Sequence, residues 1–125
     1  MDEMNKAKRK FQKELKSGTA ALVLLSVLAQ AEEPMYGYQI AKLLEAEGGD
    51  GSMVKQGALY PVLRSLESSG LLDSHVEPSV SGPPRRYYHI TQAGIASLQE
   101  WIEIWTQTKG FVDHALEGAH NDSIH

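Results

Sequence analysis

Hydrophobic residues along the chain follow the helical period over most of its length. Residues 19–31 are apolar on almost every side, which is typical of a helix buried in a core. Residues 38–45 have the i, i+3, i+4 spacing of a short amphipathic helix, and residues 55–70 carry a similar stripe. A glycine at position 70 can end that third helix in the left-handed conformation. The pattern therefore predicts three helices, with a glycine-rich loop at 48–52 between the last two.

The hydrophobic period changes after the third helix. Residues 71–77 and 85–90 are predicted strands, and the second is rich in aromatic and β-branched side chains. The segment 78–84 between them is dominated by Pro, Gly and Ser, which predicts a turn. The result is a β-hairpin with Arg85 and Arg86 close to its loop.

A long helix follows the hairpin. Thr91 is a suitable N-cap, and the helical pattern runs from there to about Leu116 with its apolar residues in two adjacent strips. One helix at the end of a small domain cannot bury both strips within its own fold, so the excess apolar surface predicts a partner. The last residues, from 117, form a polar tail whose histidines lack neighbours to orient them, and we expect no metal site there.

A charged segment precedes the apolar helix. Residues 2–16 favour a helix with a thin apolar stripe, which Ser17-Gly18 interrupts. Such a helix is marginal in water, so it packs on another surface, such as a second subunit, or remains a frayed arm. The basic stretch and apolar run also imitate a secretory signal. The run is shorter than the ~20 residues of a membrane span, and its removal would take away the core helix.

The order of three helices and a hairpin is that of a winged helix-turn-helix. The predicted fold class is mainly α with a small β-hairpin and a long C-terminal dimerisation helix. We expect an N-terminal helical arm at 1–17, the winged helix-turn-helix DNA-binding domain at 18–91, the dimerisation helix at 92–117 and the polar tail at 118–125. In such a domain the third helix enters the major groove, and the wing contacts the flanking backbone.

The charge distribution is compatible with DNA binding although the net charge is −4. Residues 1–91 carry eleven Lys and Arg against eleven Asp and Glu, whereas residues 92–125 carry one Lys against five acidic residues. Only local charge near the phosphates is needed for affinity. The chain has no cysteine, which suits a cytoplasmic protein, and no phosphate loop or acid/base pair, so we expect neither a cofactor nor an enzyme.

Four sequence blocks occur in order along the chain: YGYQI at 36–40, GALYPVL at 57–63, LESSGLL at 66–72, and GPPRRYYHIT at 82–91 with a glycine at 94. Together they resemble the signature of the PadR family (phenolic acid decarboxylase regulators) over about residues 19–105. The resemblance implies a dimeric winged-helix transcriptional repressor, and the single C-terminal helix resembles the short subfamily. Family members tend to carry Ser or Thr beside Gly57, where this chain has Gln56 and Ala58, so the capping of that helix departs from the pattern.

The predicted DNA-binding residues lie on the second and third helices and on the wing. The wing arginines would neutralise phosphates, while the start of the third helix would face base edges. Tyr36 and Tyr60 could instead be core aromatics, but the winged-helix geometry and the resemblance both place them at the DNA face. The full set is Tyr36, Gln39, Lys55, Gln56, Gly57, Tyr60, Arg64, Arg85 and Arg86.

The resemblance also implies a small-molecule site. In some short members a Trp of the last helix lines a pore between subunits and stacks on aromatic compounds. Trp105 matches that position, with Trp101 one turn earlier; alternatively, both indoles only pack a dimer interface. The predicted effector-binding set is Trp101, Trp105, Leu98, Ile102 and Leu22.

Two functions of different classes follow. One is a homodimeric repressor that binds a near-palindromic operator in double-stranded DNA and is released by a small aromatic effector. The other is a winged-helix module that binds protein and not DNA, which the negative net charge favours, together with a third helix whose only cations are Lys55 and Arg64. The sequence supplies neither the operator, nor the regulated genes, nor the effector.

Overall fold

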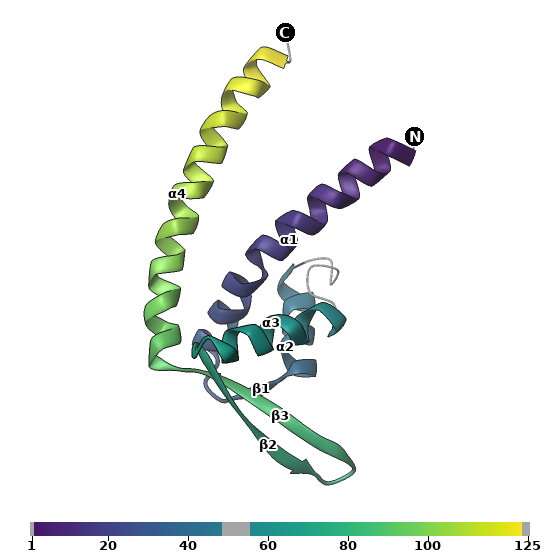
Figure 1. Ribbon diagram of the computed structural model, residues 1–125, viewed down its shortest axis with the longest axis vertical. Coiled ribbons are helices and arrows are strands. Elements are labelled where there is room, and N and C mark those ends of the chain that lie inside the picture. Colours follow the sequence, from purple (N-terminus) through teal and green to yellow (C-terminus); the bar gives the residue numbers. More distant parts are fainter. Residues whose placement is uncertain (1, 49–55, 124–125) are drawn as a thin grey trace.

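The computed structural model describes residues 2–48 and 56–123 (Figure 1). These residues form a mostly helical chain with a small antiparallel sheet, which confirms the predicted fold class. The elements are α1 (Asp2–Gln30), β1 (Met35–Tyr36), α2 (Gly37–Gly48), α3 (Gln56–Ser68), β2 (Leu72–Ser79), β3 (Gly82–Ile90) and α4 (Gln92–Ser123).

The hydrophobic core lies where the second half of α1 meets α2, α3, the sheet and the first turns of α4. The predicted stripe of α3 is its buried face, because Leu59 and Leu63 are fully enclosed and Leu66 nearly so. Burial of such side chains stabilises the fold by about 1.5–3 kcal/mol each. The core cluster consists of Leu24, Leu25, Leu28, Ile40, Ala41, Leu59, Leu63, Leu66, Leu72, Tyr88 and Leu98.

Helix α1 is one uninterrupted helix of 29 residues. The interruption expected at Ser17-Gly18 is absent, since the helix runs through both residues. A helical glycine costs only ~1 kcal/mol relative to Ala, which the packed second half of the helix offsets. The expected boundary between arm and domain, at 17/18, therefore falls inside a continuous helix.

The sheet has the order β1-β3-β2, and the hairpin is longer than expected. Strand β2 extends to Ser79 and β3 starts at Gly82, so the prolines predicted to lie in the turn are in the strands. They are tolerated because β2 is an edge strand with an irregularity between Glu77 and Ser79, and because β1 pairs only with the inner end of β3. Strand β1, with two residues, was too short for a periodic signal.

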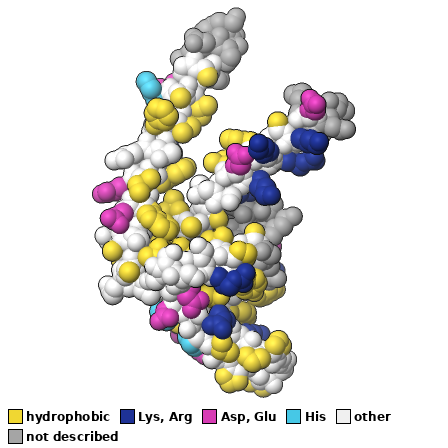
Figure 2. Space-filling view, in the orientation of Figure 1, with side chains coloured by type: hydrophobic (Ala, Val, Ile, Leu, Met, Phe, Trp, Pro, Cys, Tyr) yellow, Lys and Arg dark blue, Asp and Glu magenta, His cyan; other side chains and the backbone are white. Residues whose placement is uncertain are grey.

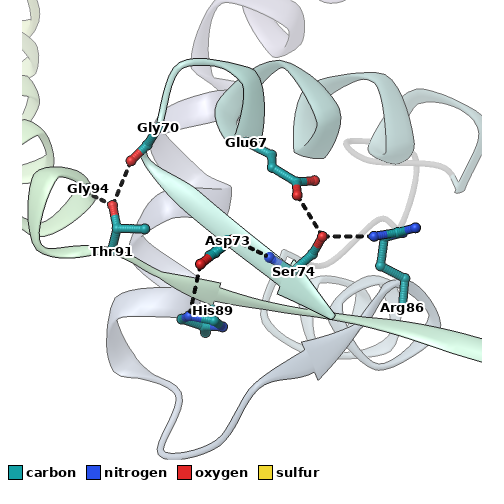
Figure 3. A network of polar contacts seen from close by, with 8 residues as sticks. All are labelled: Glu67, Gly70, Asp73, Ser74, Arg86, His89, Thr91 and Gly94. Carbon is teal, nitrogen blue, oxygen red and sulfur yellow. Dashed lines mark hydrogen bonds and ion pairs between the residues drawn. The ribbon is translucent and has the colours of Figure 1, made fainter. Parts of the chain in front are cut away.

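Thr91 links α3, the wing and α4 (Figure 3). As predicted, it caps α4, since its hydroxyl oxygen accepts the Gly94 amide at 3.0 Å. The same hydroxyl donates to the Gly70 carbonyl at 2.7 Å, and the Thr91 amide donates to the Leu71 carbonyl at 3.1 Å. Gly70 has φ +80°, the left-handed conformation expected at the end of α3.

Helix α4 continues to Ser123, past its predicted end near Leu116, so most of the predicted polar tail is helical. No proline follows, and a polar composition does not by itself end a helix. The first half of α1 and the second half of α4 diverge from the core (Figure 1) and expose large apolar side chains (Figure 2), among them Phe11, Leu15, Phe111 and Leu116. No helix within the described ranges is long and apolar enough to cross a membrane.

Candidate nucleic-acid interface

The face of α3 opposite the core is open to solvent. Among the α3 side chains that the structure describes, Arg64 is the one cation, and it is exposed together with Ser65 and Ser68. Gln56 and Gly57 form the start of α3 by their backbone, but their side-chain surroundings, like Lys55 altogether, lie outside the described residues. The outer face of the helix therefore consists of small residues and Pro61, with Arg64 as the single positive charge in its described part.

Tyr60 packs between α3 and the start of α2. It is half-buried against the core cluster, and its ring lies directly on Gly37. A Cβ at position 37 would come within 2.6 Å of the Tyr60 ring, so the close approach requires glycine. This contact joins two of the sequence blocks and gives Tyr60 a packing role beside its predicted one.

Gln39 stabilises the start of α2. Its side-chain oxygen accepts the backbone amide of Tyr36 at 3.1 Å, which is one half of the reciprocal arrangement called a capping box. The Gln39 side chain is otherwise exposed. In this arrangement its carbonyl oxygen is used within the protein, while its amide nitrogen is available to a ligand.

The two wing arginines lie on opposite faces of β3, as the strand alternation predicts. The Arg85 guanidinium lies 4.5 Å from the centre of the Tyr36 ring, and the Tyr87 ring meets Tyr36 edge-on at 5.3 Å. His75 stacks on Tyr87 with 5.7 Å between ring centres. One face of the wing thus combines the aromatic rings and Arg85 with Glu77, which lies opposite Arg85 in the register and 2.7 Å from the His75 Nε2.

Arg86 lies on the other face, toward α3 (Figure 3). Its Nη1 donates to the Ser74 hydroxyl oxygen at 3.0 Å, and that hydroxyl donates to the Glu67 carboxylate at 2.7 Å. Sequence reasoning missed Ser74 and Glu67, because only the register of the wing against α3 brings them together. The glutamate in the LESSGLL block was the one signal for this network.

Tyr88 lies beneath these charges and is 3% exposed. Burial raises the pKa of its phenol above the usual value of 10.0, and the nearby Glu67 carboxylate raises that pKa further. Arg86 and Arg64 act in the opposite direction. The charges of Arg64, Glu67 and Arg86 therefore all act on one buried ring.

The predicted effector-binding residues do not all lie together. Leu22, Trp101 and Trp105 line one apolar groove of about 490 Å³ between α1 and α4. Ile102 lies on a second groove of about 780 Å³, which it shares with Leu22, and Leu98 is buried in the core cluster. Within residues 2–48 and 56–123, no three His, Cys, Asp or Glu side chains are grouped as metal ligands.

Comparisons with known proteins identify the family of the chain. A family model described as "Transcriptional regulator PadR-like family" matches residues 24–100. The chain is 38% identical over 81 residues to a transcriptional regulator of Mycobacterium tuberculosis, which covers 64% of this chain and 72% of that protein. It is 30% identical over 87 residues to an uncharacterized protein of Lysinibacillus sphaericus, which covers 70% of this chain and 80% of that protein.

Solved structures show the same fold. A PadR family transcriptional regulator from Eggerthella lenta superimposes with a TM-score of 0.75 at 34% identity, over 94% of this chain and 98% of that one. Bacillus subtilis PadR, solved in complex with operator DNA, shares the fold with a TM-score of 0.60 at 21% identity, over 67% of this chain and 47% of that one. The chain therefore belongs to the PadR-like family, whose members are transcriptional regulators and not enzymes.

Proposed function

We propose that the protein is a homodimeric repressor that binds a near-palindromic operator through α3 and the wing. The observation that carries this proposal is the placement of Arg64, Arg85 and Arg86, which are all exposed around α3 and the hairpin. Among the described residues none of the three forms an ion pair with a carboxylate, so their charge is available to phosphates. The complex of Bacillus subtilis PadR with operator DNA supports the same use of a shared fold.

The dimer is proposed from the apolar surface of the two long helices. Phe11 is 63% exposed on α1, and Phe111 and Leu116 are 74% and 58% exposed on α4. Large apolar side chains exposed on both helices are typical of a protein–protein interface. A two-fold dimer would present two α3 helices to half-sites about one helical turn apart, which is why the operator should be near-palindromic.

Selection of bound DNA from a random pool tests the proposal, and we expect a near-palindrome. The triple variant Arg64→Ala, Arg85→Ala, Arg86→Ala should lose at least 100-fold in affinity for that DNA, since each phosphate or base contact contributes about 1–3 kcal/mol. The matched control is Lys8→Ala, Lys10→Ala, Lys13→Ala on α1, which removes the same charge far from the wing. Sedimentation should show dimers of both variants.

The protein-interaction alternative gives a different result in the same experiment. A winged-helix module that binds only protein would enrich no sequence from the pool, and the arginine variant would have no affinity to lose. Recovery of a palindrome with equal affinity for both triple variants would instead contradict the assignment of the DNA-binding face to α3 and the wing.

We propose also that the groove beside Trp101 and Trp105 binds a small aromatic effector. The support is its apolar lining, its volume of about 490 Å³ and the Trp105 side chain, which is 39% exposed. The planar cation 9-aminoacridine should quench the Trp fluorescence and release the selected DNA, and Trp105→Ala should weaken both effects at least tenfold. Unchanged release in Trp105→Ala would leave the indoles with a packing role alone.

A further inference from the structure

The contact between the wing and α3 contains a polar chain with a fixed direction (Figure 3). Ser74 lies between Arg86 and Glu67, at 3.0 Å from the Arg86 Nη1 and 2.7 Å from the Glu67 Oε2. A guanidinium can only donate and an ionised carboxylate can only accept. The Ser74 hydroxyl must therefore accept from Arg86 and donate to Glu67. Glu67 thus orients the Ser74 hydroxyl, and the hydroxyl oxygen holds the Arg86 guanidinium.

The position of Glu67 is unusual for an acidic residue. It lies at the end of α3, on the helix proposed to enter the major groove, where a carboxylate repels phosphates. No Lys or Arg nitrogen lies within ion-pair distance of it among the described residues. Its contact in the structure is the Ser74 hydroxyl, which is partly buried. A carboxylate at this position has a role if it orients Ser74, and through Ser74 the Arg86 side chain.

We propose that Glu67 and Ser74 are positioning residues that hold the Arg86 side chain on the α3 side of the wing, ready for a DNA phosphate. Only one of the five N–H donors of Arg86 is used by Ser74, so a bidentate contact with a phosphate remains open. Arg85 lacks this support and lies across the strand on Tyr36. Holding a long side chain in place before binding reduces the conformational freedom that it loses on binding.

This inference rests on the proposed DNA-binding function, and its test is a set of double variants assayed with the selected palindrome. Ser74→Ala changes no charge, and we expect it to weaken binding about three- to tenfold, the range of one hydrogen bond. The same change should have no effect in an Arg86→Ala background and its full effect in an Arg85→Ala background. An equal loss in all three backgrounds would overturn the proposal.

A pair of isosteric variants separates positioning from simple repulsion. Glu67→Gln and Asp73→Asn each remove one negative charge from neighbouring elements, but Asp73 contacts the Ser74 amide and has no contact with Arg86. An amide oxygen at position 67 accepts the Ser74 hydroxyl more weakly than the carboxylate does, so the Glu67 variant should bind the palindrome more weakly than the Asp73 variant. Equal affinity of the two variants would contradict a role of Glu67 in positioning Arg86.

A measurement without DNA distinguishes failure of this inference from failure of the proposed function. In ¹⁵N-labelled protein at low temperature, the Arg86 Nη–H resonances, which include the donor to Ser74, can be assigned by their loss in Arg86→Ala. We expect them to shift in Ser74→Ala and to stay in place in Asp73→Asn. If the wild-type protein binds no DNA, the proposed function fails, yet this shift still decides whether Ser74 holds Arg86.

Discussion

The winged-helix region and the outer halves of the two long helices differ in whether their apolar side chains are buried within the chain. In the first, the largest fully buried side chains belong to one cluster, and Thr91 connects three elements by hydrogen bonds. In the second, apolar residues such as Phe11 and Phe111 stand in solvent on diverging helices (Figures 1 and 2). The first region buries its apolar side chains within the chain, whereas we expect the second to bury its apolar surface against a partner.

The largest contrast is expected between leucines of the two regions. Leu63→Ala, in the core, should lower the free energy of unfolding by about 2–5 kcal/mol, because a fully buried side chain leaves a cavity. Leu116→Ala, on exposed α4, should change the free energy of unfolding of dilute protein by less than about 0.5 kcal/mol. Urea unfolding monitored by circular dichroism measures both free energies. A similar decrease in the two variants would contradict the difference between the two regions.

The second contrast concerns association. Phe111→Ala should weaken the dimer at least tenfold, corresponding to about 1.4 kcal/mol, since the exposed ring is the largest apolar group on the outer half of α4. Val80→Ala at the wing tip, also exposed, is the control and should leave the dimer unchanged. Sedimentation equilibrium measures both, and an unaffected dimer in Phe111→Ala would place the interface elsewhere.

Two glycines, one in each region, should respond in opposite directions to substitution by alanine. Gly94→Ala should destabilise the fold by about 1–3 kcal/mol, because an added Cβ would meet the Leu71 carbonyl and lie 2.6 Å from the Ile90 side chain. Gly110→Ala, with open space around it on α4, should instead stabilise by up to about 1 kcal/mol through helix propensity. Thermal unfolding of the two variants tests this, and a shift of the same sign in both would contradict it.

The smallest expected effect is a pH dependence that belongs to the winged-helix region. The pKa of Tyr88 is raised in the folded protein, chiefly by burial, so the folded state keeps its proton at pH values where the unfolded state loses it. The stabilisation is fully present below pH 10 and is lost as pH rises through the folded pKa, at no more than about 1.4 kcal/mol per pH unit. Tyr88→Phe should reduce this slope, measured by urea unfolding from pH 9 to 11, whereas Tyr38→Phe at an exposed site should not.

The parts of the fold that the sequence predicted are those with a strong period. The stripe of α3, the alternation of β3 and the Thr91 cap were all confirmed, because each depends on residues close together in the chain. The continuity of α1 was missed, since a glycine lowers helix propensity locally while the packing of the second half decides the outcome.

The candidate site was predicted less completely than the fold. Charged side chains on the wing were visible in the sequence, but the opposite placement of Arg85 on Tyr36 and Arg86 on Ser74 depends on contacts between distant elements. Ser74 and Glu67 have no local pattern that marks them. Leu98 was expected beside the effector and lies in the core, because the helical strip to which it belongs turns inward at the start of α4.

The salt dependence of binding to the selected palindrome tests the central claim most directly. If the arginines of α3 and the wing contact phosphates, the affinity should fall steeply between 50 and 200 mM salt, and the slope should decrease by about one for each arginine contact removed. The Lys8→Ala, Lys10→Ala, Lys13→Ala control should keep the wild-type slope. An affinity that does not change over this salt range, or an equal slope for the arginine triple variant, would contradict the account.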